Sequence, residues 1–303
     1  MKQVNALSID KQFKEKMRSK TVFTVHSVFE RTINILIEND LFTLACDQID
    51  SAPATLVIDI PDFNECQIKA NTQGFLSLTT VEITGYLAIN LTTASIWECQ
   101  LIDFSLHHHH LGKNISLAMQ EITSKGNAKW LRKENSTLTA FDKEMTRMLT
   151  ERTTNLIESF QKNTNDTIEE TIQCAKKLIG LGQGLTPSGD DFLVGLLLAF
   201  STSNTTFFNQ EKWREQIVKE AKSHTNIISY SAIKYAASGQ TRETIALFIE
   251  TLDAKENDEQ VKLALANVMK IGSSSGTEMA WGILNGLTLL LKQEEQNDNT
   301  SKN

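Results

Sequence analysis

A glycine-rich segment near the middle of the chain has the composition of a ligand-binding turn. It runs from Gly180 to Gly195 with the sequence GLGQGLTPSGDDFLVG, and three glycines alternate over its first five residues. Glycine accepts positive φ angles and lets the backbone approach a ligand closely. Pro187 fixes one φ angle and keeps Thr186 out of the helical region, so Ser188 is the expected N-cap of a following helix, with Asp191 three residues later. The free N–H groups and positive dipole end of that helix predict a cradle for a small anion.

A second segment repeats part of this pattern later in the chain. Ser275 to Gly282 aligns with Ser188 to Gly195 through a shared Ser-Gly, any residue, an acid, three residues and a final Gly. Both segments lead into an apolar run, and Gly272 stands just before the second. The repetition predicts two helix N-termini of similar construction, which we expect to converge on one pocket.

Plain helix capping is the alternative interpretation of both segments. Ser188 with Asp191, and Ser275 with Glu278, match the capping box, in which a serine and an acid satisfy the first backbone N–H groups of a helix. The final glycine of each segment would then serve close helix packing. Capping does not account for the glycines before Ser188, or for Asp190 beside Asp191.

The same segment argues against two kinds of nucleotide site and leaves a metal open. A dinucleotide fingerprint places its glycines after a strand, whereas here they follow a predicted helix, and a P-loop needs a lysine that is missing. The adjacent carboxylates of Asp190 and Asp191 would suit Mg²⁺. Alternate imidazoles of His107 to His110 would bind a metal in an extended stretch, although a solvated loop is the default. We otherwise expect no cofactor.

The first motif resembles the signature of a known family. The run from Gly182 to Gly195, with its GLTPSGDDFL core, is similar to the signature of the AllH family, a former domain of unknown function. The segment from Gly272 to Gly282 resembles the later Ser-Gly motif of that family, with Thr277-Glu278 in place of a more acidic version. The first third of the chain shows no motif that we can match.

The resemblance implies an activity and partners. Members of the family are similar to a subunit of oxamate carbamoyltransferase, which exchanges oxalurate and phosphate for oxamate and carbamoyl phosphate in anaerobic allantoin and purine degradation. They occur with FdrA-like, acyl-CoA-synthetase-like partners, so we expect a carbamoyltransferase subunit that is inactive without other subunits. The phosphate loop of the usual transcarbamoylases, Ser-x-x-Arg-Thr-Arg, is absent, so the chemistry must be organised differently. The alternative is a non-catalytic ligand-binding or assembly subunit.

Roles for individual residues follow from the resemblance and the anion cradle together. Backbone N–H groups near Gly184 to Gly189 would hold a carboxylate or phosphate and stabilise charge that develops at the carbamoyl carbon. We expect Asp190 to position a substrate amide or a metal, and Asp191 to order the turn. The catalytic candidates are Asp190, Asp191 and Ser188. The candidates for substrate binding are Gly182, Gly184, Thr186, Gly189, Ser274, Ser275, Gly276 and Glu278.

The elements that must position these residues change character along the chain. The first third alternates apolar and polar residues as strands do, and the remainder shows helical spacing. We predict an α+β protein with an N-terminal antiparallel β domain, either a sheet or a small barrel, over 1–110, and a helical domain over 111–303 with a disordered tail from about 292. The strands are predicted at 21–29, 33–44 (a hairpin), 55–60, 75–83 and 95–104. The helices are predicted at 115–122, 141–160, 168–179, 192–200, 213–222, 228–237, 241–252, 259–270 and 277–291.

Composition narrows the class of protein further. The net charge of −7, from 30 basic and 37 acidic residues without a basic cluster, argues against nucleic-acid binding. The apolar run from Phe192 to Phe200 is far shorter than the roughly twenty residues of a membrane span. The four cysteines are widely spaced and form no Cys-x-x-Cys pair, which favours free thiols in the reducing cytoplasm.

Overall fold

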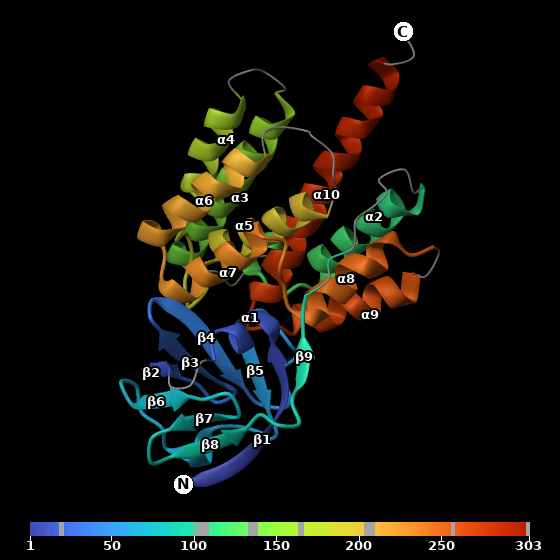
Figure 1. Cartoon of the computed structure of the whole chain (residues 1–303). Helices are drawn as coiled ribbons and strands as arrows, with labels where there is room; N and C mark the ends of the chain where they lie inside the picture. Colours follow the sequence, from blue (N-terminus) through green and yellow to red (C-terminus); the bar gives the residue numbers. More distant parts are fainter. Residues whose placement is uncertain are drawn as a thin grey trace. The chain divides into compact units, whose positions relative to one another are not determined.

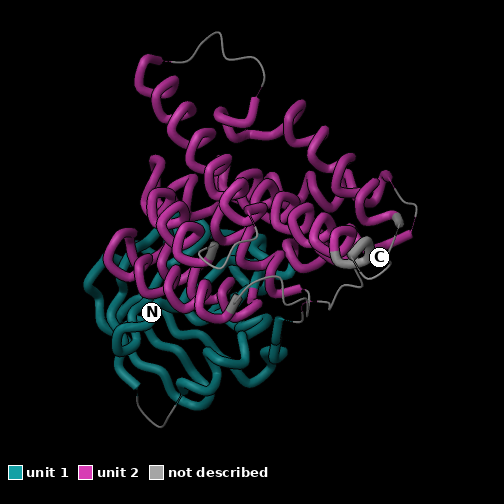
Figure 2. The backbone as a smooth tube through the Cα atoms, turned by 90° about the horizontal axis from the view of Figure 1, so that it is seen from above, with its two compact units in different colours: residues 1–100, 241–243 teal, residues 101–240, 244–303 magenta. Residues whose placement is uncertain are grey.

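The computed structural model describes residues 1–17, 21–99, 101, 109–132, 139–162, 167–202, 210–255 and 258–300. The chain divides into two compact units (Figure 2). Unit 1 comprises Met1–Gln100 with Thr241–Glu243, and unit 2 comprises Leu101–Gln240 with Thr244–Asn303. None of the described helices is long and apolar enough to span a membrane.

Unit 1 is a β barrel. Its strands follow the order β5-β4-β3-β2-β6-β7-β8-β1, the ring closes where β1 pairs with β5, and β9 adds to β1 (Figure 1). Most pairs are antiparallel, whereas β1–β8, β1–β9 and β4–β5 are parallel. A short helix α1, Lys11–Glu15, follows β1. The strands are β1 Lys2–Asp10, β2 Thr21–Val28, β3 Thr32–Ile37, β4 Asp40–Ala45, β5 Thr55–Ile58, β6 Gln73–Leu76, β7 Thr80–Ile83, β8 Leu87–Asn90 and β9 Ser95–Trp97.

The strand patterns of the sequence account for most of the barrel. The predicted hairpin is present, with Ile37 paired to Asp40 across a tight turn in which Glu38 adopts a positive φ of 59°. The run predicted as one strand over 75–83 is instead two strands, because the hydroxyl of Ser77 accepts a hydrogen bond from the amide of Thr80 and stabilises a turn between them. Strands β1 and β8 were not predicted.

Unit 2 is helical, so the predicted α+β class, with the β region before the helical region, is confirmed. Its central helix α5 is buried from Gly189 to Phe200, as expected for an apolar helix inside a bundle. Helix α10 continues to Thr300 instead of ending near Leu291, so the predicted disordered tail is helical up to that residue. The helices are α2 His109–Lys125, α3 Ala140–Gln161, α4 Thr167–Lys176, α5 Ser188–Ser201, α6 Gln210–His224, α7 Ile227–Ala237, α8 Glu243–Asp253, α9 Asp258–Met269 and α10 Ser275–Thr300, with a 3₁₀ turn at Lys129–Leu131.

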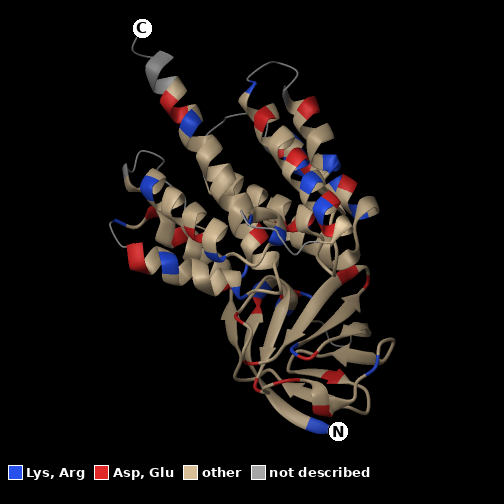
Figure 3. Ribbon diagram, turned by 180° about the vertical axis from the view of Figure 1, so that it is seen from behind, with Lys and Arg blue, Asp and Glu red and all other residues tan. Residues whose placement is uncertain are grey.

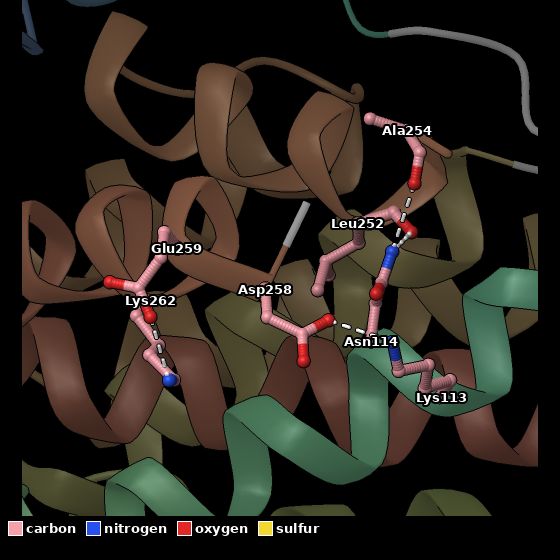
Figure 4. Close-up of polar contacts among 7 residues, drawn as sticks. All are labelled: Lys113, Asn114, Leu252, Ala254, Asp258, Glu259 and Lys262. Atoms are coloured by element: carbon pink, nitrogen blue, oxygen red, sulfur yellow. Dashed lines mark hydrogen bonds and ion pairs between the residues drawn. The ribbon is translucent and has the colours of Figure 1, made fainter. Parts of the chain in front are cut away.

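Polar contacts join the outer helices of unit 2. The fully buried side chain of Asn114 on α2 donates from Nδ2 to the carbonyl oxygens of Leu252 and Ala254, at 3.0 and 3.1 Å, and so satisfies the C-terminal end of α8 (Figure 4). Lys113 pairs with Asp258 at the start of α9 over 2.8 Å. Acidic and basic residues are interspersed along the helices (Figure 3). Two of the four consecutive histidines that were considered as metal ligands, His107 and His108, lie outside the described residues.

Helices α5 and α10 touch through glycine. A Cβ atom on Gly195 would lie 2.0 Å from the carbonyl oxygen of Met279, and one on Gly282 would lie 2.1 Å from that of Phe192. The close contacts continue in the same direction along both helices, to Gly286 beside Ala199, so the two helices run parallel. The expected packing role of the two final motif glycines is confirmed.

Candidate active site

Parallel packing of α5 and α10 brings the two predicted helix starts together. The hydroxyl oxygens of Thr186, just before α5, and Ser275, the first residue of α10, lie 2.8 Å apart and share a hydrogen bond. Each helix N-terminus is the positive end of a helix dipole, so two positive ends meet at this junction. The two predicted helix starts therefore meet, whereas the pocket on which they were expected to converge stays a prediction.

The serines do not cap these helices in the predicted way. Pro187 occupies the N-cap of α5 without a side-chain cap bond, and Ser188 is the first helical residue. Helix α10 likewise begins at Ser275, and its first-turn acid Glu278 accepts a hydrogen bond at Oε2 from the hydroxyl of Ser274 over 3.3 Å. The predicted capping boxes are wrong because each serine lies one position too far into its helix.

Asp190 ties the turn to the helices around it. Its side chain is 1% exposed, and Oδ1 accepts a hydrogen bond from the amide of Gly180 over 2.8 Å. The hydroxyl of Thr225 donates to Oδ2. Burial raises the pKa of Asp190, while these two hydrogen bonds act in the opposite direction. Asp190 thus orders the turn, which is the role that the sequence had suggested for Asp191.

Asp191 and Glu278 form a buried acid pair where the two helices meet. They are 3% and 2% exposed, and they lie close enough for the charge of Glu278 to raise the pKa of Asp191. Glu278 accepts a hydrogen bond at Oε1 from the indole N–H of Trp130 over 2.9 Å and one at Oε2 from the hydroxyl of Ser274 over 3.3 Å. In contrast, Asp191 Oδ2 is buried without a hydrogen-bond partner.

The environment of the pair favours one shared proton, located on Asp191. Burial raises the pKa of Asp191 well above its ordinary value, and the charge of Glu278 raises it further, against the opposing effect of the Ser275 and Thr186 hydroxyls. Burial also raises the pKa of Glu278, but its several hydrogen-bond donors oppose that effect. Two carboxyl groups in contact cannot both ionise easily. The arrangement therefore suits a neutral Asp191 beside an ionised Glu278.

The glycine turn has the predicted backbone. Gly180, Gly182 and Gly184 adopt positive φ angles of 72°, 133° and 93°. A Cβ atom on Gly180 would lie 2.4 Å from the carbonyl oxygen of His224, and one on Gly182 would lie 2.4 Å from the amide of Ser188. At Gly184, however, nothing lies within 4 Å of such an atom. The first two glycines are required by packing, whereas the third is open to a ligand.

The backbone N–H groups of the turn are only partly available. The amide of Gly189 donates to the carbonyl oxygen of Leu181 over 2.8 Å, so it does not face a ligand. The stretch from Gln183 to Leu185 is exposed, and its amides and that of Thr186 are not used in the hydrogen bonds of the described residues. The backbone N–H groups that remain available to an anion are therefore those of Gln183 to Thr186, on the exposed side of the turn.

The glycine of each Ser-Gly pair is explained by packing. A Cβ atom on Gly189 would lie 2.1 Å from the carbonyl oxygen of Leu178, and one on Gly276 would lie 1.8 Å from that of Val268. Each helix start is thus pressed against the end of the preceding helical segment in the same way. The shared Ser-Gly pattern reflects this common construction.

Sequence reasoning missed two residues of the site, Trp130 and Thr225. A buried indole N–H needs an acceptor, and this requirement is the signal that could have pointed to Trp130. In the described part of the chain, no three His, Cys, Asp or Glu side chains gather as they would around a metal ion. The neighbouring Asp190 and Asp191 have separate partners.

The chain is an α+β protein in which a barrel is followed by a helical unit. Its candidate catalytic site is the acid pair between the parallel starts of α5 and α10. The chain belongs to the AllH family: the model of oxamate carbamoyltransferase subunit AllH matches residues 178–287, and that of the AllH family N-terminal domain matches residues 5–96. The predicted family is confirmed, and the match extends to the barrel, where no motif was found. The family description makes the chain a carbamoyltransferase subunit. No solved structure matches the chain.

Rising pH is expected to destabilise the acid pair. Because Asp191 has a raised pKa in the folded protein, its contribution to stability is complete below the unfolded pKa of about 4 and is lost as pH rises through the folded pKa. We expect the free energy of unfolding to fall between about pH 5 and about pH 8, and Asp191→Asn to remove at least about 1 kcal/mol of that fall.

Urea denaturation followed by circular dichroism at both pH values measures this effect. Glu169→Gln, at an exposed position of α4, is the matched control and should keep the pH dependence of the parent protein. An Asp191→Asn variant with an unchanged pH dependence would show that the pair is fully ionised.

Proposed function

We propose that this chain binds oxalurate and phosphate at the α5–α10 junction and supplies the proton for their conversion to oxamate and carbamoyl phosphate. The reaction would serve anaerobic allantoin and purine degradation. The observation that carries the proposal is the buried pair of Asp191 and Glu278 beside an exposed glycine turn. The family description supports carbamoyl transfer as the reaction class.

Anion binding is assigned to the exposed side of the turn. Both substrates are anions, and the amides of Gln183 to Thr186 offer N–H donors close to two helix N-termini. The hydroxyls of Thr186 and Ser275 lie at the same place. A pair that shares one proton carries a single negative charge, so it opposes an incoming anion less than two carboxylates would.

Proton transfer is assigned to Asp191. An oxygen of phosphate attacks the carbamoyl carbon of oxalurate, and the bond from that carbon to the amide nitrogen of the oxamate part breaks. The leaving nitrogen takes the proton of Asp191, and the proton of hydrogen phosphate returns to the acid pair. Glu278 keeps Asp191 protonated beforehand and stays ionised through its contacts with Trp130 and Ser274.

We propose that FdrA-like and other carbamoyltransferase subunits complete the enzyme, as the family description of a subunit suggests. The four cysteines are free thiols, which supports assembly in the reducing cytoplasm. The test is phosphate-dependent cleavage of oxalurate by the chain with these partners and by the chain alone. If substrates bind but no combination turns them over, the chain is a binding or assembly subunit.

Gly184→Ala is expected to weaken the binding of oxamate to the isolated chain by at least about tenfold. Alanine is strained at the positive φ angle of Gly184, so the substitution should shift the amides of the turn. Its matched control is Gly85→Ala in unit 1, where the glycine has a similar φ of 83° and equally open surroundings. Both variants should lose similar stability. Calorimetric titration with oxamate should show weaker binding only for Gly184→Ala.

A cavity of about 680 Å³ between α6 and α7 offers a second place for an anion. Arg214, Lys219, Lys222 and Lys234 line it and outnumber the acids Glu211 and Glu215. The double variant of Lys219→Gln with Lys222→Gln should keep its affinity for oxamate. Loss of affinity in that double variant, with normal binding by Gly184→Ala, would contradict the proposed site.

A further inference from the structure

A separate cavity of about 450 Å³ lies beside the acid pair, within unit 2. Its walls come from α2, the 3₁₀ turn at Lys129–Leu131, α3, α5 and α10. The volume lies in the range of small-molecule sites, which are roughly 300–1,000 Å³. Proton transfer as derived above makes no use of this space.

Aromatic side chains form much of the lining. Trp130, Trp281 and Phe192 all border the cavity, and two of the four tryptophans of the chain are therefore found there. Aromatic rings favour planar ligands, because stacked and edge-on contacts add to the burial of apolar area. The cavity is thus shaped by groups that recognise a flat molecule.

The polar groups of the lining exclude an anionic ligand. Thr123, Thr154 and Asn285 offer hydroxyl and amide groups, Glu158 adds a carboxylate, and the lining contains neither Lys nor Arg. An anion would meet a like charge without a cation to compensate for it. An uncharged ligand with hydrogen-bond donors and acceptors fits this set, in contrast to the anions proposed for the glycine turn.

The cavity is connected to the acid pair through shared side chains. Trp130 faces the cavity and donates its indole N–H to Glu278. Trp281 and Asn285 follow Glu278 by one and two turns of α10, and Phe192 follows Asp191 in α5. A ligand that moves the ring of Trp130 would change the hydrogen bonding of Glu278.

We propose that this cavity binds an uncharged, planar nitrogen heterocycle that stacks on Trp130 and Trp281, and that its occupancy is sensed by the acid pair. The hydroxyls of the threonines and the carboxylate of Glu158 select the heterocycle by its hydrogen-bonding edge. Binding at this place does not depend on the proposed carbamoyl transfer, because it requires neither partners nor turnover.

The test uses adenine as the probe, with indole and oxamate for comparison. Adenine is expected to quench the tryptophan fluorescence of the full chain with a saturable isotherm, and calorimetry should give the same affinity. Indole should bind at least tenfold more weakly, because it has a single N–H donor and lacks the ring acceptors and amino group of adenine. Oxamate should not compete with adenine. Absence of saturable adenine binding, or equal binding of indole, would overturn the proposal.

A pair of variants on α3 places the ligand in the cavity. Thr154→Phe fills the cavity from its exposed rim and should weaken adenine binding at least tenfold. Asn155→Phe introduces the same side chain at the next residue, which is exposed and does not line the cavity. Equal affinity in both variants would show that adenine binds elsewhere and would overturn the proposal.

Discussion

Asp191→Asn is expected to lower kcat for oxalurate cleavage by the assembled enzyme about 10²–10⁴-fold, the usual contribution of a general acid. Asparagine has the shape of aspartate and preserves the burial of the site, but it has no proton to give to the leaving nitrogen. The parent enzyme should lose activity as pH rises through the raised pKa of Asp191, whereas the residual activity of the variant should not follow that titration. A pH profile of kcat measures both effects.

Asp190→Asn is the neighbouring control for this prediction. Asp190 holds Gly180 and Thr225 and does not contact the proposed reacting atoms, so its loss should loosen the turn and raise KM with a smaller change in kcat. If Asp190→Asn abolished turnover while Asp191→Asn stayed close to the parent enzyme, the roles of the two acids would have to be exchanged.

Local rules predicted the parts of the site that depend on neighbouring residues. Glycine alternation indicated the positive φ angles of Gly180, Gly182 and Gly184, and proline at 187 indicated where α5 begins. The repeat of the Ser-Gly pattern indicated two similar helix starts. In the barrel, alternation of apolar residues located β3, because a half-buried strand imposes that period, whereas a compact apolar run located the fully buried β5.

Packing between distant segments determined what the sequence did not predict. The meeting of Asp191 with Glu278 depends on α5 and α10 being parallel, and no local pattern encodes the direction of two helices that are far apart in the chain. Adjacent residues of a helix point about 100° apart, so Asp190 and Asp191 contact different partners. The parallel pairing of β1 with β8 likewise depends on closure of the barrel.

Gly195→Ala is expected to destabilise unit 2 by about 1–3 kcal/mol, or more if the helices cannot separate, because a methyl group there enters a backbone contact. Its Cβ atom would lie 2.0 Å from the carbonyl oxygen of Met279. The same reasoning applies to Gly282→Ala, whose Cβ atom would lie 2.1 Å from the carbonyl oxygen of Phe192. Urea denaturation monitored by circular dichroism measures the loss.

Gly112→Ala on α2 is the matched control, because nothing lies within 4 Å of a Cβ atom at that helical position. It should stabilise the protein by about 0.5–1 kcal/mol, as alanine does in place of glycine inside a helix. If Gly195→Ala were as well tolerated as Gly112→Ala, α5 and α10 would not be in backbone contact. The separation of the two helices sets the separation of Asp191 and Glu278, so the shared proton and the proposed chemistry would then lose their structural basis.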